Sequence, residues 1–87
     1  MDWDYHHGGF QVFGKVPHDM DLPPAIGNRA KITKEQFEFE VEIESIEAGR
    51  FVGRVLLISP GTALEALGIK RGEKVHFRAN NILVLYR

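Results

Sequence analysis

Hydrophobic and polar residues alternate strictly along the middle of the chain. In residues 37–44, FEFEVEIE, phenylalanine, valine or isoleucine occupies every odd position and glutamate every even one. Only an extended strand separates such a pattern into one apolar and one acidic face. The pattern therefore predicts a half-buried strand, which pairs with the following residues 50–58 as an antiparallel hairpin.

The turn of this hairpin lies in EAGR, residues 47–50, where Gly49 can supply a positive φ. A two-residue turn would set Ile43 against Arg54, whereas a three-residue loop with a glycine bulge keeps the apolar faces of both strands together. We expect the three-residue loop, with Glu42 or Glu44 opposite Arg54. The core residues that this register predicts are Phe37, Phe39, Val41, Ile43, Val55 and Leu57.

Shorter patterns predict the remaining elements. Residues 10–16 indicate an edge strand that ends before a proline, residues 17–28 a loop, and residues 29–32, 74–78 and 82–86 further strands. In TALEALG, residues 62–68, Thr62 and Glu65 have capping-box spacing and Gly68 stands where a helix would end. The resulting fold class is mainly β: a small antiparallel β-barrel or curled sheet of five to six strands, with one short helix near residues 62–68.

Composition bounds the class of protein. The 87 residues suit one domain, for which we expect residues 1–9 to form a flexible N-terminal arm and residues 10–87 a single barrel-like unit. There is no cysteine, so disulfides and thiolate metal sites are excluded, which suits a reducing compartment. The first residues lack the features of a signal peptide, and no apolar run is long enough for a membrane span. We therefore expect a cytoplasmic protein without a membrane partner.

Charge is distributed unevenly. Residues 1–49 hold four Lys/Arg against ten Asp/Glu, a balance of −6, and residues 50–87 hold seven against two, a balance of +5. One interpretation is neutralisation of the glutamate row by basic strands of the same sheet. The other is a basic binding face or a contact between two copies of the chain.

One segment resembles known families. LEALGIKRGEKVHF, residues 64–77, is similar to the LGI–x–x–G–[DE]–x–V–x–F stretch of AbrB- and MazE-type swapped-hairpin regulators. The wider region 53–86 also resembles the end of the molybdate-binding Mop or TOBE module and small bacterial families of unknown function. The regulator resemblance implies DNA binding, and the Mop resemblance implies oxyanion binding near Ser59, Thr62 or Lys70.

Three kinds of binding chemistry follow from these residues. A nucleic-acid surface would use basic side chains on one face, which Arg50 and Arg87 could help to line. The candidates for direct contact are Arg54, Lys70, Arg71, Lys74 and Arg78. An oxyanion could bind where the predicted helix begins, at Ser59, Gly61 and Thr62, although helix capping explains the same residues. The histidines and aspartates of residues 6–21 lack metal-ligand spacing, so no metal site is predicted.

No pattern indicates an enzyme or a cofactor. The chain has no nucleophile elbow, phosphate-binding loop or dinucleotide fingerprint. The glutamate row is a solvent-facing face of a strand rather than a set of buried acids. The hypothesis that remains is a non-enzymatic interaction module whose partner is another protein or a second copy of itself. A nucleic-acid-binding regulatory module is the first alternative and a small-oxyanion-binding module the second.

Overall fold

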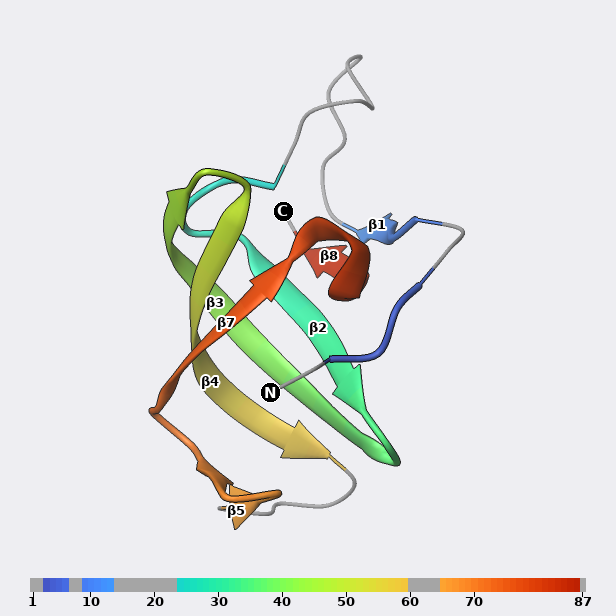
Figure 1. Ribbon diagram of the computed structural model, residues 1–87, viewed down its shortest axis with the longest axis vertical. Helices are drawn as coiled ribbons and strands as arrows, with labels where there is room; N and C mark the ends of the chain where they lie inside the picture. The colour runs from blue at the N-terminus through green and yellow to red at the C-terminus, as the bar shows by residue number, and fades with distance from the viewer. Residues whose placement is uncertain (1–2, 7–8, 14–23, 60–64, 87) are drawn as a thin grey trace.

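The computed structural model describes residues 3–6, 9–13, 24–59 and 65–86. Six strands form one sheet in the order β1-β8-β2-β3-β4-β7, and β5 and β6 form a separate two-stranded sheet (Figure 1). The strands of the large sheet are β1 Gln11–Phe13, β2 Arg29–Lys34, β3 Phe37–Glu47, β4 Arg50–Ser59, β7 Lys74–Arg78 and β8 Ile82–Tyr86. The small sheet comprises β5 Glu65–Ala66 and β6 Ile69–Lys70, and the 3-10 turn η1 Ala79–Asn81 links β7 to β8.

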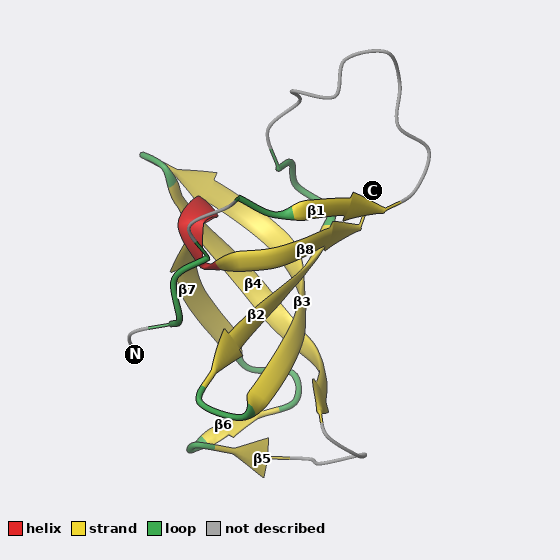
Figure 2. Ribbon diagram, turned by 90° about the vertical axis from the view of Figure 1, so that its right-hand side faces the viewer, coloured by secondary structure: helices red, strands yellow, loops and turns green. Residues whose placement is uncertain are grey.

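The mainly β class predicted from the alternation is confirmed. All neighbours in the large sheet are antiparallel except β1, which runs parallel to β8, so the sheet is mixed rather than wholly antiparallel. The sheet curls around its apolar face, as the two views show (Figures 1 and 2). Its described strands do not close into a barrel, because β1 and β7 remain as edges. The curled sheet, not the closed barrel, is therefore the correct alternative.

The helix expected near residues 62–68 is wrong for its described part. Residues 65 and 66 pair as β5 with β6, and Leu67 and Gly68 form the two-residue turn between them with φ values of 54° and 79°. Two successive positive φ values are typical of a tight hairpin turn. Gly68 thus has the left-handed conformation that a helix end would also use, which explains why the local pattern resembled a helix terminus.

The β3–β4 hairpin reaches its register differently from the prediction. Glu47 lies opposite Arg50, so the turn has two residues, Ala48 and Gly49, with φ values of 49° and 77°. The expected three-residue loop is therefore wrong. A register shift between Ile43 and Ser45 then brings Ile43 opposite Gly53, which restores the shared apolar face by a bulge.

A second register shift, between Glu40 and Val41, changes the alternation of β4. Val55 stays buried, but the extra residue Leu56 turns the strand over, so that Leu57 is 50% exposed and Ile58 only 2%. The prediction that Leu57 belongs to the core is wrong for this reason. Phe37 packs half-buried against the core, and the other predicted members are buried.

The N-terminal residues contribute to the core. Trp3 is only 5% exposed, and its ring packs edge-on against Phe39 with 5.1 Å between ring centroids. Its indole Nε1 donates to the carbonyl oxygen of His76 over 2.9 Å. We call residues 3–6 the N-terminal strap, because these described residues of the expected arm are bonded to both β2 and the β7–β8 connection.

Asn81 holds the strap to η1. This buried side chain accepts a hydrogen bond from the backbone N–H of Arg78 and donates to the carbonyl oxygens of Trp3 and Asp4. On the other side, the Asp4 N–H donates to the Thr33 carbonyl in β2. The strap therefore ties β7 to β2 where the curled sheet is open.

Candidate functional site

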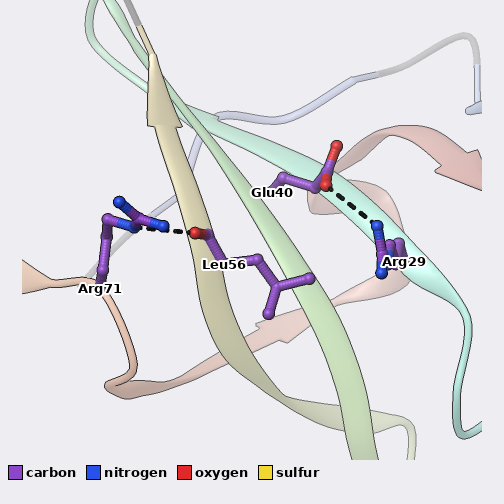
Figure 3. Close-up of polar contacts among 4 residues, drawn as sticks. All are labelled: Arg29, Glu40, Leu56 and Arg71. Atoms are coloured by element: carbon purple, nitrogen blue, oxygen red, sulfur yellow. Dashed lines mark hydrogen bonds and ion pairs between the residues drawn. The ribbon is translucent and has the colours of Figure 1, made fainter. Parts of the chain in front are cut away.

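The outer face of β3 carries the glutamate row, and basic residues of neighbouring strands pair with it. From β2, Arg29 lies 3.9 Å from Glu40 (Figure 3) and Lys31 lies 3.4 Å from Glu38. Burial opposes the charge of Lys31, but its pKa is nevertheless raised by Glu38 and Tyr86. These ion pairs confirm that strands of the same sheet neutralise part of the acidic row.

Glu44 is the extra residue of the bulge between Ile43 and Ser45, and its carboxylate forms ion pairs with two cations. One carboxylate oxygen lies 2.9 Å from the Arg54 guanidinium and the other 3.8 Å from the Lys74 ammonium. The second oxygen is shielded from solvent and has no hydrogen-bond partner among the described residues. A bulge changes the direction of the side chain at the extra residue, so that one carboxylate can neutralise a cation on β4 and another on β7.

The outer face of β4 and β7 is basic. The register sets Arg50 opposite Arg78 and Arg54 opposite Lys74, with Val52 and His76 between the two rows. Like charges directly opposite each other on adjacent strands are destabilising. Glu44 compensates the Arg54–Lys74 row, whereas no ion pair is formed by Arg50 or Arg78 within the described residues.

The structure brings together only some of the predicted nucleic-acid residues. Arg54, Lys74 and Arg78 share the outer face of β4 and β7, and Arg50 completes the set. Lys70 lies in β6, and the Nε of Arg71 donates to the Leu56 carbonyl over 3.0 Å (Figure 3). Only the pairing of β4 with β7 reveals the place of Arg50, since 27 residues separate it from Arg78 in the chain.

The second edge of β7 is partly free in the described structure, from Lys74 to the N–H of His76. The Glu73 carbonyl accepts from the Val55 N–H of β4, while the His76 carbonyl accepts from Trp3 outside the sheet. Because backbone groups alternate along a strand, Lys74, His76 and Arg78 direct theirs away from β4. Among the described residues, the His76 carbonyl accepts from Trp3, the Arg78 N–H donates to Asn81, and the Arg78 carbonyl belongs to the first turn of η1. The groups without a partner among these residues are the N–H and carbonyl of Lys74 and the N–H of His76.

A groove of about 730 Å³ runs along this edge. Its lining combines apolar and basic side chains with one acidic one, and it includes Trp3, Ile69, Phe77, Arg50, Arg78 and Glu73. Tyr5 is 64% exposed beside it. The unpaired backbone groups of β7, the apolar lining and the basic outer face thus meet at one place, which we call the β7 groove.

The oxyanion candidates lie elsewhere. Ser59 ends β4 and lies opposite Glu38, while Gly61 and Thr62 fall outside the described residues. Residues 65 and 66, which were expected to belong to the helix that would create this site, form β5 instead. The oxyanion site therefore stays a prediction without its helical basis.

Three polar side chains at the strap suggest catalysis at first sight. His6 Nε2 lies 3.1 Å from the Thr33 hydroxyl, which donates to the Asp4 carboxylate over 3.1 Å. Because the only hydroxyl proton goes to Asp4, Thr33 accepts from His6 and is not activated as a nucleophile. The arrangement serves to fasten the strap. Within the described residues, no three His, Asp or Glu side chains gather as a metal-ligand set.

Comparison with known proteins adds no relative. No family model matches the chain, and neither the curated proteins nor the solved structures contain a match. None of the helices in the described part of the chain is long and apolar enough to cross a membrane.

Proposed function

We propose that the protein is a non-enzymatic interaction module that binds an extended segment of a partner polypeptide along the free edge of β7. The observation that carries this proposal is the β7 groove, into which Lys74 and His76 direct unpaired backbone groups. An extended peptide adds a strand to such an edge, so main-chain hydrogen bonds supply affinity and alternate side chains supply specificity.

The groove suits a polypeptide better than a nucleic acid. Two of the four cations on the outer face, Arg54 and Lys74, are already paired with Glu44. The chain as a whole carries a net charge of −1, whereas dedicated nucleic-acid binders have a strongly basic domain. Nucleic acid remains the second candidate, favoured by the single face that holds Arg50, Arg54, Lys74 and Arg78.

Self-association through the same edge is opposed by charge. If two copies paired β7 with β7, their Lys74, His76 and Arg78 side chains would lie beside one another on the same outer face. Basic residues on an edge strand are a common protection against this kind of edge-to-edge pairing. The occupant of the groove is therefore a different polypeptide.

The test is an amide chemical-shift titration of the isotope-labelled full chain, combined with hydrogen exchange. The probes are two blocked heptapeptides, one alternating threonine with valine and one alternating glutamate with valine, and a mixed-sequence single-stranded DNA. We expect at least one peptide to shift the amides of residues 74–78 and to slow exchange of the His76 N–H. If neither peptide does so at millimolar concentration, the proposal fails. Shifts produced by DNA alone would establish the second candidate.

A further inference from the structure

Charge on the outer face of the sheet changes from strand to strand. Basic residues project from β2, glutamates from β3, and basic residues again from β4. Ion pairs join β2 to β3 and β3 to β4. At the next boundary, β4 and β7 are both basic, so this boundary lacks the alternation of the others.

The uncompensated charge lies at one end of this boundary. Arg50 and Arg78 are exposed and directly opposite each other, and both line the β7 groove. Glu47 lies beside Arg50 in the register, yet no ion pair joins them in the described structure. A strand added to the free edge of β7 would place its outward side chains next to Lys74, His76 and Arg78.

The opposite side of such a strand would meet an apolar surface. Val75 and Phe77 point into the core and are buried, and Ile69 and Trp3 continue the apolar lining of the groove. Because successive side chains of a strand point to opposite faces, every second residue of the ligand would contact this lining. The intervening residues would face the cations.

We propose that the polypeptide bound in the β7 groove alternates acidic and apolar residues, with its carboxylates on the outer face beside His76 and Arg78, where Arg50 and Arg78 lack an ion-pair partner among the described residues. This inference rests on the proposed function and adds the chemistry of the ligand. The chain contains one such segment in β3, but both edges of β3 are already paired, with β2 and β4. The acidic strand must therefore come from another protein.

The experiment compares three blocked heptapeptides, in which valine alternates with glutamate, threonine or lysine, and a mixed-sequence single-stranded DNA as ligands of the full chain. Dissociation constants are measured at low and high salt from the amide shifts of residues 74–78. The glutamate peptide is expected to bind about tenfold more tightly than the threonine peptide at low salt, and this preference is expected to shrink at high salt because exposed charges are screened.

Two double variants locate the effect. R50Q/R78Q is expected to weaken binding of the glutamate peptide about three- to tenfold, as exposed charge pairs are individually weak, and to leave the threonine peptide unchanged. R29Q/K34Q removes the same charge from β2 and is expected to change neither constant. Thermal unfolding of both variants controls for loss of the fold.

The outcomes separate the two proposals. If the threonine and glutamate peptides bind equally well, or if R29Q/K34Q weakens the glutamate peptide as much as R50Q/R78Q does, the charge inference is overturned while edge binding stands. If no peptide shifts residues 74–78, edge binding itself is overturned. If only single-stranded DNA gives salt-sensitive shifts there, the cations serve nucleic acid and both proposals fall.

Discussion

Replacing Trp3 with alanine should cost a large part of the stability of this domain. Trp3 is only 5% exposed, and its ring packs edge-on against Phe39 with 5.1 Å between the ring centroids. Truncation of a buried Trp to Ala typically costs about 3–5 kcal/mol. Loss of the indole hydrogen bond to the His76 carbonyl adds about 0.5–1.5 kcal/mol. Since small domains are stable by only about 5–15 kcal/mol, W3A is expected to unfold at far lower urea concentration.

Two further variants test which part of this loss comes from the hydrogen bond and whether it is specific to Trp3. W3F keeps an aromatic ring beside Phe39 but loses the N–H donor, so we expect a loss of about 1–2 kcal/mol from the hydrogen bond and the smaller ring. I26A alters an exposed hydrophobic side chain outside the strap, and we expect a change within about 0.5 kcal/mol.

Urea unfolding followed by circular dichroism measures all three variants. Trp3 is the only tryptophan, so the emission of the unaltered protein reports its environment directly. We expect blue-shifted emission that moves to longer wavelength in the same transition as the circular dichroism signal. A loss below 1 kcal/mol in W3A, or emission typical of a solvated indole in the folded protein, would refute the packing of the strap.

Three other substitutions test the sheet itself. R78E replaces the like charge opposite Arg50 with a carboxylate. We expect the free energy of unfolding to rise by about 0.5–1.5 kcal/mol, and this gain should diminish at high salt. An unchanged or lower free energy of unfolding in a urea titration would contradict the register of β4 and β7. G53A is expected to lower the free energy of unfolding by about 1–3 kcal/mol, because the new methyl group would lie 2.9 Å from a Val41 methyl group. Unchanged stability would show that the core has room for the methyl group. A48N should gain about 0.5–1 kcal/mol, since Ala48 has a φ of 49° in a two-residue turn that favours Asn before Gly, and a loss in thermal unfolding would argue against this turn.

Edge binding connects the strap with the groove. The Trp3 indole occupies the His76 carbonyl on the same edge that a ligand strand would use. A ligand strand paired along β7 must therefore either leave the His76 carbonyl bonded to the Trp3 indole or displace the indole N–H from that carbonyl. The His76 N–H, which has no partner among the described residues, is the more direct reporter of strand addition.

Much of the fold could be predicted from alternation because the relation between side-chain period and strand geometry is local. The apolar face of β3 and the buried Val75 and Phe77 followed from period two, and the strand 82–86 followed from an apolar run after a turn. The helix expectation failed because Gly68 suits a helix end and a tight hairpin turn equally well, and local sequence does not choose between them.

The candidate site was only partly predictable. Arg54, Lys74 and Arg78 were identified as basic candidates, and the structure places them on one face. The position of Arg50 opposite Arg78 and the groove beside it depend on the pairing of β4 with β7, and the exposed Leu57 depends on a bulge within β4. Such features arise from long-range register, which no short sequence pattern encodes.

By itself, the sequence determined which segments are extended and which of their faces is apolar, because these properties depend on the chemical nature of neighbouring residues. Only the tertiary structure decided the neighbours of each strand, the position of both bulges and the burial of Trp3. These outcomes depend on how distant segments fill a common core and satisfy one another's backbone groups. The proposed function rests on that second level, since the outer edge of β7 and the two arginines facing each other across β4 and β7 exist only once the sheet has formed.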